Sequence, residues 1–146
     1  MARLPYIDVN QLPQKDHDLL KIPLNLYRKL VNSPDGARAF RNLGHHIRFT
    51  STLDARIREL AIIQVGFLAK SEYEYCHHVS MGLEQFGLYE GDIHAIKSES
   101  HGEPSALGEL EKRVLRSARD MYTKLKISDE DFEFLKNSFT YELSLI

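Results

Sequence analysis

The chain has 146 residues, of which 42% are hydrophobic and 27% are charged, as is ordinary for a globular domain. Its 19 basic and 21 acidic residues give a net charge of -2, which disfavours nucleic acid as a partner. No apolar run approaches the roughly 20 residues of a membrane span, and the first residues lack the apolar core of a secretory signal. The single cysteine cannot form an internal disulfide, which fits a reducing compartment. We therefore expect one cytoplasmic domain over residues 1–146, with neither a membrane nor a nucleic-acid partner.

The first third of the chain predicts an extended arm followed by two helices. Residues 1–15 contain two prolines and are expected to form the arm. Residues 17–32 have helical apolar spacing, although Pro23 should break or kink that helix. The second helix should begin with Ser33 as its N-cap and Pro34 at its first position.

The rest of the chain predicts more helices joined by turns. They are expected within residues 52–70, 71–86, 89–98, 107–125 and 128–139. Gly87 is a natural helix stop, and residues 99–109 cluster Gly, Pro and Ser as a loop does. The helix within 107–125 has an apolar stripe of Leu110, Val114, Leu115, Ala118 and Met121. Because no sustained β-branched alternation occurs, the predicted class is all-α.

Glu59 lies in the most apolar of these helices. At roughly 100° per residue, one side of the helix carries mainly apolar residues, and Glu59 lies on the other. That other side also holds Ile62, Ile63 and Gly66, so the helix is apolar nearly all round and should be buried. A buried carboxylate needs a partner, a proton or a cleft. Both a structural ion pair with a nearby arginine and a functional role stay open.

The following helix contains Glu74, Cys76, His77 and His78. Glu74 and His78 are four residues apart and share one face, where their side chains can meet. Cys76 lies roughly 160° from that face, which predicts a small apolar residue of the core. His77 lies apart from both faces and is expected to be solvated. Ser71 and Glu74 also have the spacing of a capping box, which requires no catalysis.

Metal binding is weakly indicated by this sequence. A zinc site uses three or four ligands at recognisable spacing. Neither an HExxH nor a CxxC pattern is present, and the adjacent His45 and His46 form only a second bare pair. We therefore expect no metal and no cofactor.

The segment LDARIRELAIIQVGFLAKSEYEYCHHV, followed by GLYEGDIHAI, resembles the carboxymuconolactone decarboxylase family. Members of that family typically show an Arg-Glu-Leu-Ala helix, then Ser-Glu-Tyr-Glu-Trp and a His-Val pair. The earlier LPYIDVNQLP and PLNLYRKLVNSP resemble its N-terminal segment, so the likeness covers most of the chain. It implies a compact multi-helix domain of the alkyl hydroperoxidase D type, with a central antiparallel helix pair. Members commonly continue past the segment matching TYELSLI into another apolar helix.

The D component of alkyl hydroperoxide reductase shares this fold and carries two redox cysteines in a Cys-x-His-Cys run. By resemblance, its helix glutamate falls on Glu59 and its later histidine on His78. The two cysteine positions fall on Ser71 and Glu74, and the histidine between them falls on Tyr73. Because both redox cysteines are absent, the chain is similar to the non-redox branch.

The resemblance implies decarboxylase-like lyase chemistry on a small carboxylated or lactone substrate, carried out without a cofactor. His78 would be the general acid or base, and Glu59 would orient it or relay a proton. Ser71, Tyr73 and Glu74 would shape or polarise the pocket, and Arg58 would meet a substrate carboxylate.

Two other functions stay open beside the lyase. One is a thiol-dependent peroxidase, which requires an exposed and activated Cys76. The other is a non-catalytic oligomeric protein that keeps the fold. Family members assemble as trimers or hexamers, so the resemblance also implies a homo-oligomer.

Overall fold

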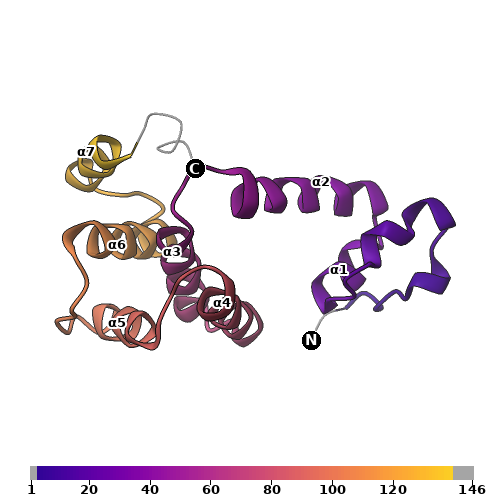
Figure 1. The fold of residues 1–146 in the computed structure, drawn as a ribbon, viewed down its shortest axis with the longest axis horizontal. Helices are drawn as coiled ribbons and strands as arrows, with labels where there is room; N and C mark the ends of the chain where they lie inside the picture. The colour runs from indigo at the N-terminus through magenta and orange to yellow at the C-terminus, as the bar shows by residue number, and fades with distance from the viewer. Residues whose placement is uncertain (1–2, 140–146) are drawn as a thin grey trace. The chain divides into compact units, whose positions relative to one another are not determined.

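The computed structural model describes residues 3–139 and divides the chain into two compact units, Met1–Ser51 and Thr52–Ile146 (Figure 1). Every regular element in the described part is helical, which confirms the all-α prediction. The prediction of a single domain over the whole chain stays a prediction. The segment TYELSLI lies outside the described residues. No helix within residues 3–139 is both long enough and apolar enough to cross a membrane.

The first unit is built from short helices. Its elements are the 3₁₀ helices η1 (Val9–Gln11) and η2 (Gln14–Leu20), the α-helices α1 (Asn25–Leu30) and α2 (Pro34–His45), and the π-helix η3 (His46–Thr50). The predicted break at Pro23 is confirmed, because η2 and α1 flank it. Ser33 and Pro34 begin α2 as predicted, although the Ser33 side chain makes no capping hydrogen bond.

Two arginines of α2 tie it to η2. Arg38 donates to Asp16 Oδ1 at 2.8 Å and to Asp18 Oδ2 at 2.9 Å, and Arg41 donates to the same Asp18 oxygen at 2.8 Å. The Arg38 guanidinium, helped by Arg41, lowers the pKa of Asp18 to about 2. The unit also has a small hydrophobic core of Leu19, Leu20, Val31 and Ala37.

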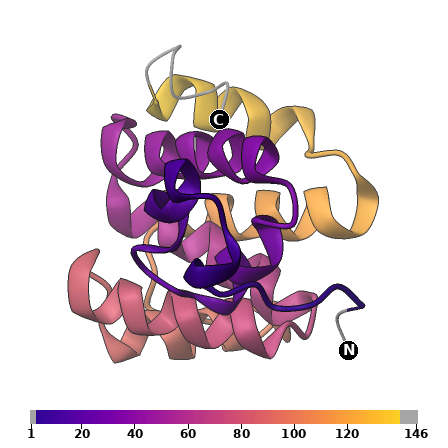
Figure 2. The same cartoon turned by 90° about the vertical axis from the view of Figure 1, so that its right-hand side faces the viewer.

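The second unit contains the five helices expected in the rest of the chain. They are α3 (Ala55–Leu68), α4 (Glu72–Gln85), α5 (Glu90–Ser100), α6 (Glu109–Lys124) and α7 (Asp129–Ser138). Helix α3 packs against α4, α5 and α6 and is therefore central. Figures 1 and 2 show α6 between α5 and α7. The core residues are Ile57, Leu60, Ile63, Leu88, Ile93, Ala95, Ile96, Leu107, Val114 and Leu115.

Local signals set most of these helix ends. Gly87 has φ +77° and follows α4, as a helix stop requires. Ser128 caps α7 by accepting a hydrogen bond from the Asp131 backbone amide at 3.1 Å. Along the apolar stripe predicted for α6, Val114 and Leu115 are buried, whereas Met121 near the end of the helix is exposed. The buried part of α6 is near Val114 and Leu115, and Met121 lies in the next two turns toward its end.

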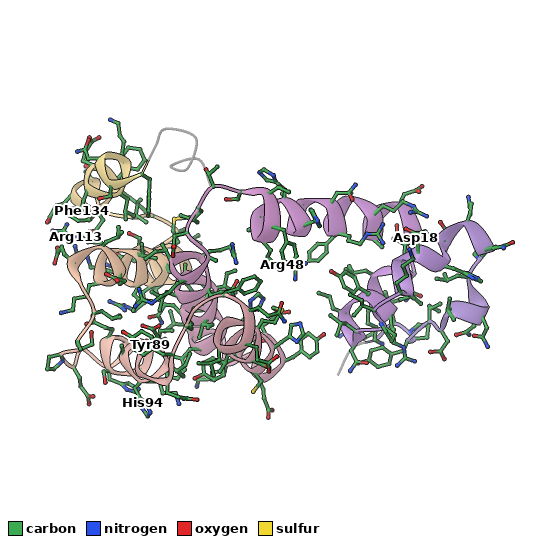
Figure 3. All side chains as sticks on the ribbon, in the orientation of Figure 1. Asp18, Arg48, Tyr89, His94, Arg113 and Phe134 are labelled. Carbon is green, nitrogen blue, oxygen red and sulfur yellow. The ribbon has the colours of Figure 1, made fainter. Side chains whose placement is uncertain are left out.

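Buried carboxylates join the helices of this unit. Asp131 of α7 accepts hydrogen bonds from Arg113 and Arg116 of α6, and the Arg116 guanidinium in particular lowers its pKa to about 2. Arg113 also covers the ring of Phe134 at 4.8 Å from its centroid (Figure 3). Asp131 is thus ionised at neutral pH and holds α7 on α6 as one member of a charge network.

Candidate functional site

A buried pair of Glu59 and His78 forms the centre of the candidate site. Glu59 Oε2 lies 2.7 Å from His78 Nδ1, across the contact between α3 and α4. The Glu59 side chain is 0% exposed and His78 is also buried. An ionised carboxylate can only accept a hydrogen bond, so Nδ1 carries a proton beside it, and Nε2 is the ring nitrogen that does not contact Glu59. The expected approach of Glu59 and His78 is confirmed.

A tight connection and a close helix contact bring the pair together. Only Ala69, Lys70 and Ser71 separate α3 from α4, and Lys70 adopts a left-handed conformation with φ +51°. Gly66 lies where the two helices meet, since a Cβ there would be 3.3 Å from the backbone nitrogen of Tyr75. A larger residue would push α4 outward, and His78 with it.

Arg58 shares the Glu59 carboxylate with His78. Arg58 Nε donates to Glu59 Oε1 at 3.2 Å, and the guanidinium covers the ring of Phe86 at 4.7 Å. The Arg58 side chain is 4% exposed, and its buried Nη2 has no hydrogen-bond partner in the described part of the chain. The predicted ion pair of Glu59 with a nearby arginine is therefore confirmed at Oε1, while Oε2 contacts the histidine. A functional role for Glu59 stays a prediction.

Glu74 adds a second carboxylate on the other side of the imidazole. Its Oε2 lies 3.7 Å from His78 Nε2, and its side chain is 45% exposed. This separation is too long for a hydrogen bond but close enough for electrostatic attraction. The predicted meeting of Glu74 and His78 on one face of α4 is confirmed. His78 thus lies between a buried and a half-exposed carboxylate.

The other two predicted binding residues, Ser71 and Tyr73, lie at the start of α4 and line two different surface hollows. Ser71 is the N-cap residue of α4 by position, but its side chain makes no capping hydrogen bond, so the predicted capping box with Glu74 is wrong. Tyr73 stacks on His77, with ring centroids 6.0 Å apart and an interplanar angle of 9°. Tyr73 lines a surface pocket with Cys76, while Ser71 and Glu74 line a different groove.

That groove, which we call the α3 groove, has a volume of about 400 Å³. Its lining in the described part of the chain is Ala61, Ile62, Val65, Gly66, Ala69, Ser71, Glu74 and Ala118. Sequence reasoning did not find it, because three helices contribute to it. One feature of the sequence could have indicated it. Helix α3 is apolar nearly all round, so the residues that do not face the core, such as Val65, leave apolar surface exposed.

Cys76 is not a core residue, contrary to the sequence prediction. It is exposed and lines an open surface pocket of about 550 Å³ with Glu72, Tyr73, His77 and Ser80. The neighbouring Tyr75 and Val79 are the residues of α4 that pack on the core. Successive residues differ by roughly 100° around a helix, so Cys76 turns away from the core where Tyr75 faces it. His77, expected to be solvated, is half-buried.

Within residues 3–139, no three side chains among His, Cys, Asp and Glu gather as a metal site would require. The second histidine pair has other contacts. His46 Nδ1 lies 2.8 Å from Thr50 Oγ1, and the His45 ring packs on Phe49. Both contacts are within the first unit.

Comparison of the chain with known protein families, characterised proteins and solved structures finds no match. The resemblance to the carboxymuconolactone decarboxylase family therefore stays an expectation. The site itself consists of a buried histidine between two carboxylates, one of which, Glu74, lines the apolar α3 groove.

Proposed function

We propose that the chain is a cofactor-independent lyase of the carboxymuconolactone decarboxylase type, acting on a small carboxylated or lactone substrate. The observation that carries the proposal is the 2.7 Å contact between Glu59 Oε2 and His78 Nδ1. A buried carboxylate that orients an imidazole is a common arrangement for general acid–base catalysis. The α3 groove next to Glu74 supplies a place for a small molecule.

In this proposal His78 Nε2 handles the proton and Glu59 holds the imidazole. When the substrate loses CO₂, the electron pair of the broken C–C bond remains as an enolate. His78, protonated on both nitrogens, stabilises that negative charge and then donates its Nε2 proton to the carbon. Glu59 stabilises the imidazolium through Nδ1, as Arg58 in turn holds Glu59. Arg58 Nη2 is buried, so it would reach a substrate carboxylate only after a movement that exposes the guanidinium.

The proposal is tested by replacing His78 with alanine. We expect CO₂ release from a panel of carboxylated lactones, followed by ¹³C NMR, to fall by about 10²–10⁴-fold in His78→Ala, because the proton donor is lost. The Cys76→Ser variant should retain full turnover. Unchanged turnover in His78→Ala, with the helical circular dichroism intact, would contradict the assignment.

Thiol-dependent peroxidase activity is the second candidate, and the exposure of Cys76 favours it. The chain has one cysteine, so an external thiol would have to reduce the sulfenic acid formed by a peroxide. His78→Ala and Cys76→Ser distinguish the two candidates, because each variant should abolish one activity and leave the other intact. Peroxide consumption that disappears in Cys76→Ser and survives in His78→Ala would support the peroxidase.

We propose self-association on the basis of exposed apolar side chains at the C-terminal end of α6. Met121 and Tyr122 lie in the last turn, Leu125 is the residue that ends the helix, and all three are exposed within the second unit. We expect the chain to sediment as a trimer or hexamer and the Met121→Glu/Leu125→Glu variant to dissociate toward monomer. The nearby Lys126→Glu should not dissociate, because it changes charge without removing apolar surface. A monomeric wild type would contradict this proposal.

A further inference from the structure

We propose that Glu74 returns a proton from water to His78 Nε2 after each turnover and is therefore the proton relay of the site. This inference rests on the proposed function, in which His78 gives its Nε2 proton to the product carbon. It deepens that function by assigning the source of the replacement proton. It follows from the positions of the two carboxylates beside His78 and from their different exposure to solvent.

His78 needs a route to water because its imidazole is largely enclosed. The side chain is 11% exposed, and its Nδ1 is engaged by Glu59 Oε2 at 2.7 Å. The ring of His77 stands nearly perpendicular to it, with ring centroids 6.1 Å apart. Water therefore has little direct access to the imidazole, and a neighbouring acid that exchanges protons with solvent would speed the return of a proton to Nε2.

Glu59 is poorly placed to supply that proton. Its side chain is 0% exposed, so it has no direct contact with solvent. Both of its oxygens are engaged, Oε1 with Arg58 Nε and Oε2 with His78 Nδ1. The Arg58 guanidinium gives the ionised carboxylate a counter-charge. Glu59 therefore orients the imidazole from its buried side, and the replacement proton has to come from the other side.

Glu74 has the two properties that a relay needs. Its side chain is 45% exposed, so it can take a proton from water, and its Oε2 lies 3.7 Å from His78 Nε2. One bridging water or a small side-chain rotation closes that separation. The two residues are four apart on α4, so the helix keeps their side chains on one face. Glu74 thus connects the nitrogen that loses its proton with the solvent.

The protons balance over one cycle. Loss of CO₂ leaves the electron pair of the broken C–C bond on the substrate, and the Nε2 proton of the doubly protonated His78 forms the new C–H bond. His78 is then neutral and keeps its proton on Nδ1, beside Glu59. The Glu74 carboxylate takes a proton from solvent hydronium, passes it to Nε2 and becomes ionised again. Each CO₂ released therefore consumes one proton from solvent.

The first test needs no substrate, because it measures how fast the His78 Nε2 proton exchanges with water. The protein is labelled with ¹⁵N-histidine, and the exchange rate is measured by NMR from the transfer of water magnetisation. We expect exchange to slow at least about tenfold in Glu74→Gln, whose amide keeps the size of the side chain but cannot carry the proton. Glu72→Gln is the matched control and should exchange like the wild type, since Glu72 is also in the first turn of α4 but lines the Cys76 pocket. Exchange unaffected by Glu74→Gln would overturn the inference.

The second test follows CO₂ release from the panel of carboxylated lactones. Because the relay acts after CO₂ has left, Glu74→Ala should lower kcat at least about tenfold and keep kcat/KM within about threefold of the wild type. Added formate should restore kcat, since formic acid can enter the vacated space and protonate Nε2. An unchanged kcat, or an equal loss of kcat and kcat/KM without rescue by formate, would overturn the relay. Failure of the proposed function looks different, because Glu74 would still control Nε2 exchange while no CO₂ release depended on His78.

Discussion

Replacing Glu59 with alanine is expected to lower the free energy of unfolding by about 3–5 kcal/mol. Glu59 is fully buried and is the acceptor for both Arg58 Nε and His78 Nδ1. Its removal leaves the buried Arg58 guanidinium without a counter-charge, and the penalty for an uncompensated buried charge exceeds the value of a typical hydrogen bond. Urea unfolding followed by circular dichroism at 222 nm measures the change.

Two further variants separate charge from hydrogen bonding at this position. Glu59→Gln keeps an acceptor oxygen and should cost less, about 1–3 kcal/mol. The double variant Arg58→Met/Glu59→Leu removes both charges and should recover much of the loss seen in Glu59→Ala. Glu74→Gln is the control, because its half-exposed carboxylate should contribute less than about 1 kcal/mol. A loss below about 1 kcal/mol in Glu59→Ala would show that Arg58 does not depend on this carboxylate.

The sequence predicted the features that depend on one helix or one turn alone, such as where a helix begins or ends. Pro23, Ser33, Gly87 and Ser128 each act on their own neighbours, and the helices begin or end near them as expected. Glu59 could be predicted to be buried because its own helix is apolar all round. The sequence could not decide whether Glu59 pairs with an arginine or with a histidine, because that depends on how α3 and α4 pack against each other.

What the sequence missed depends on how far, and at which rotation, each helix packs against its neighbours. Cys76 lies at the edge of the apolar arc of α4, so a small rotation decides whether it faces the core or solvent. Met121 continues the α6 stripe beyond the buried residues Val114 and Leu115. The α3 groove combines residues of three helices, and no spacing within one helix encodes it.

Replacing Arg56 with alanine is expected to destabilise the second unit by about 3–5 kcal/mol and to leave the first unit unchanged. Arg56 of α3 donates to both oxygens of Asp92 in α5, at 3.0 and 2.6 Å, and to Glu111 Oε1 in α6 at 2.9 Å. The Asp92 side chain is 0% exposed, so the variant leaves a buried carboxylate without its cation. The same guanidinium lowers the pKa of Glu111, which ties α6 into the network.

Native-state hydrogen exchange can measure this effect separately in the two units. In Arg56→Ala the amides of α3, α5 and α6 should lose protection, while those of α2 should not, because Met1–Ser51 has its own core and ion pairs. Arg38→Ala is the matched control, since it removes the arginine that holds Asp16 and Asp18 and should affect α2 and η2 alone. Arg56→Lys keeps the charge but loses the two-oxygen geometry, so its loss should be intermediate. Equal loss of protection in both units after Arg56→Ala would instead mean that the whole chain unfolds as one cooperative domain.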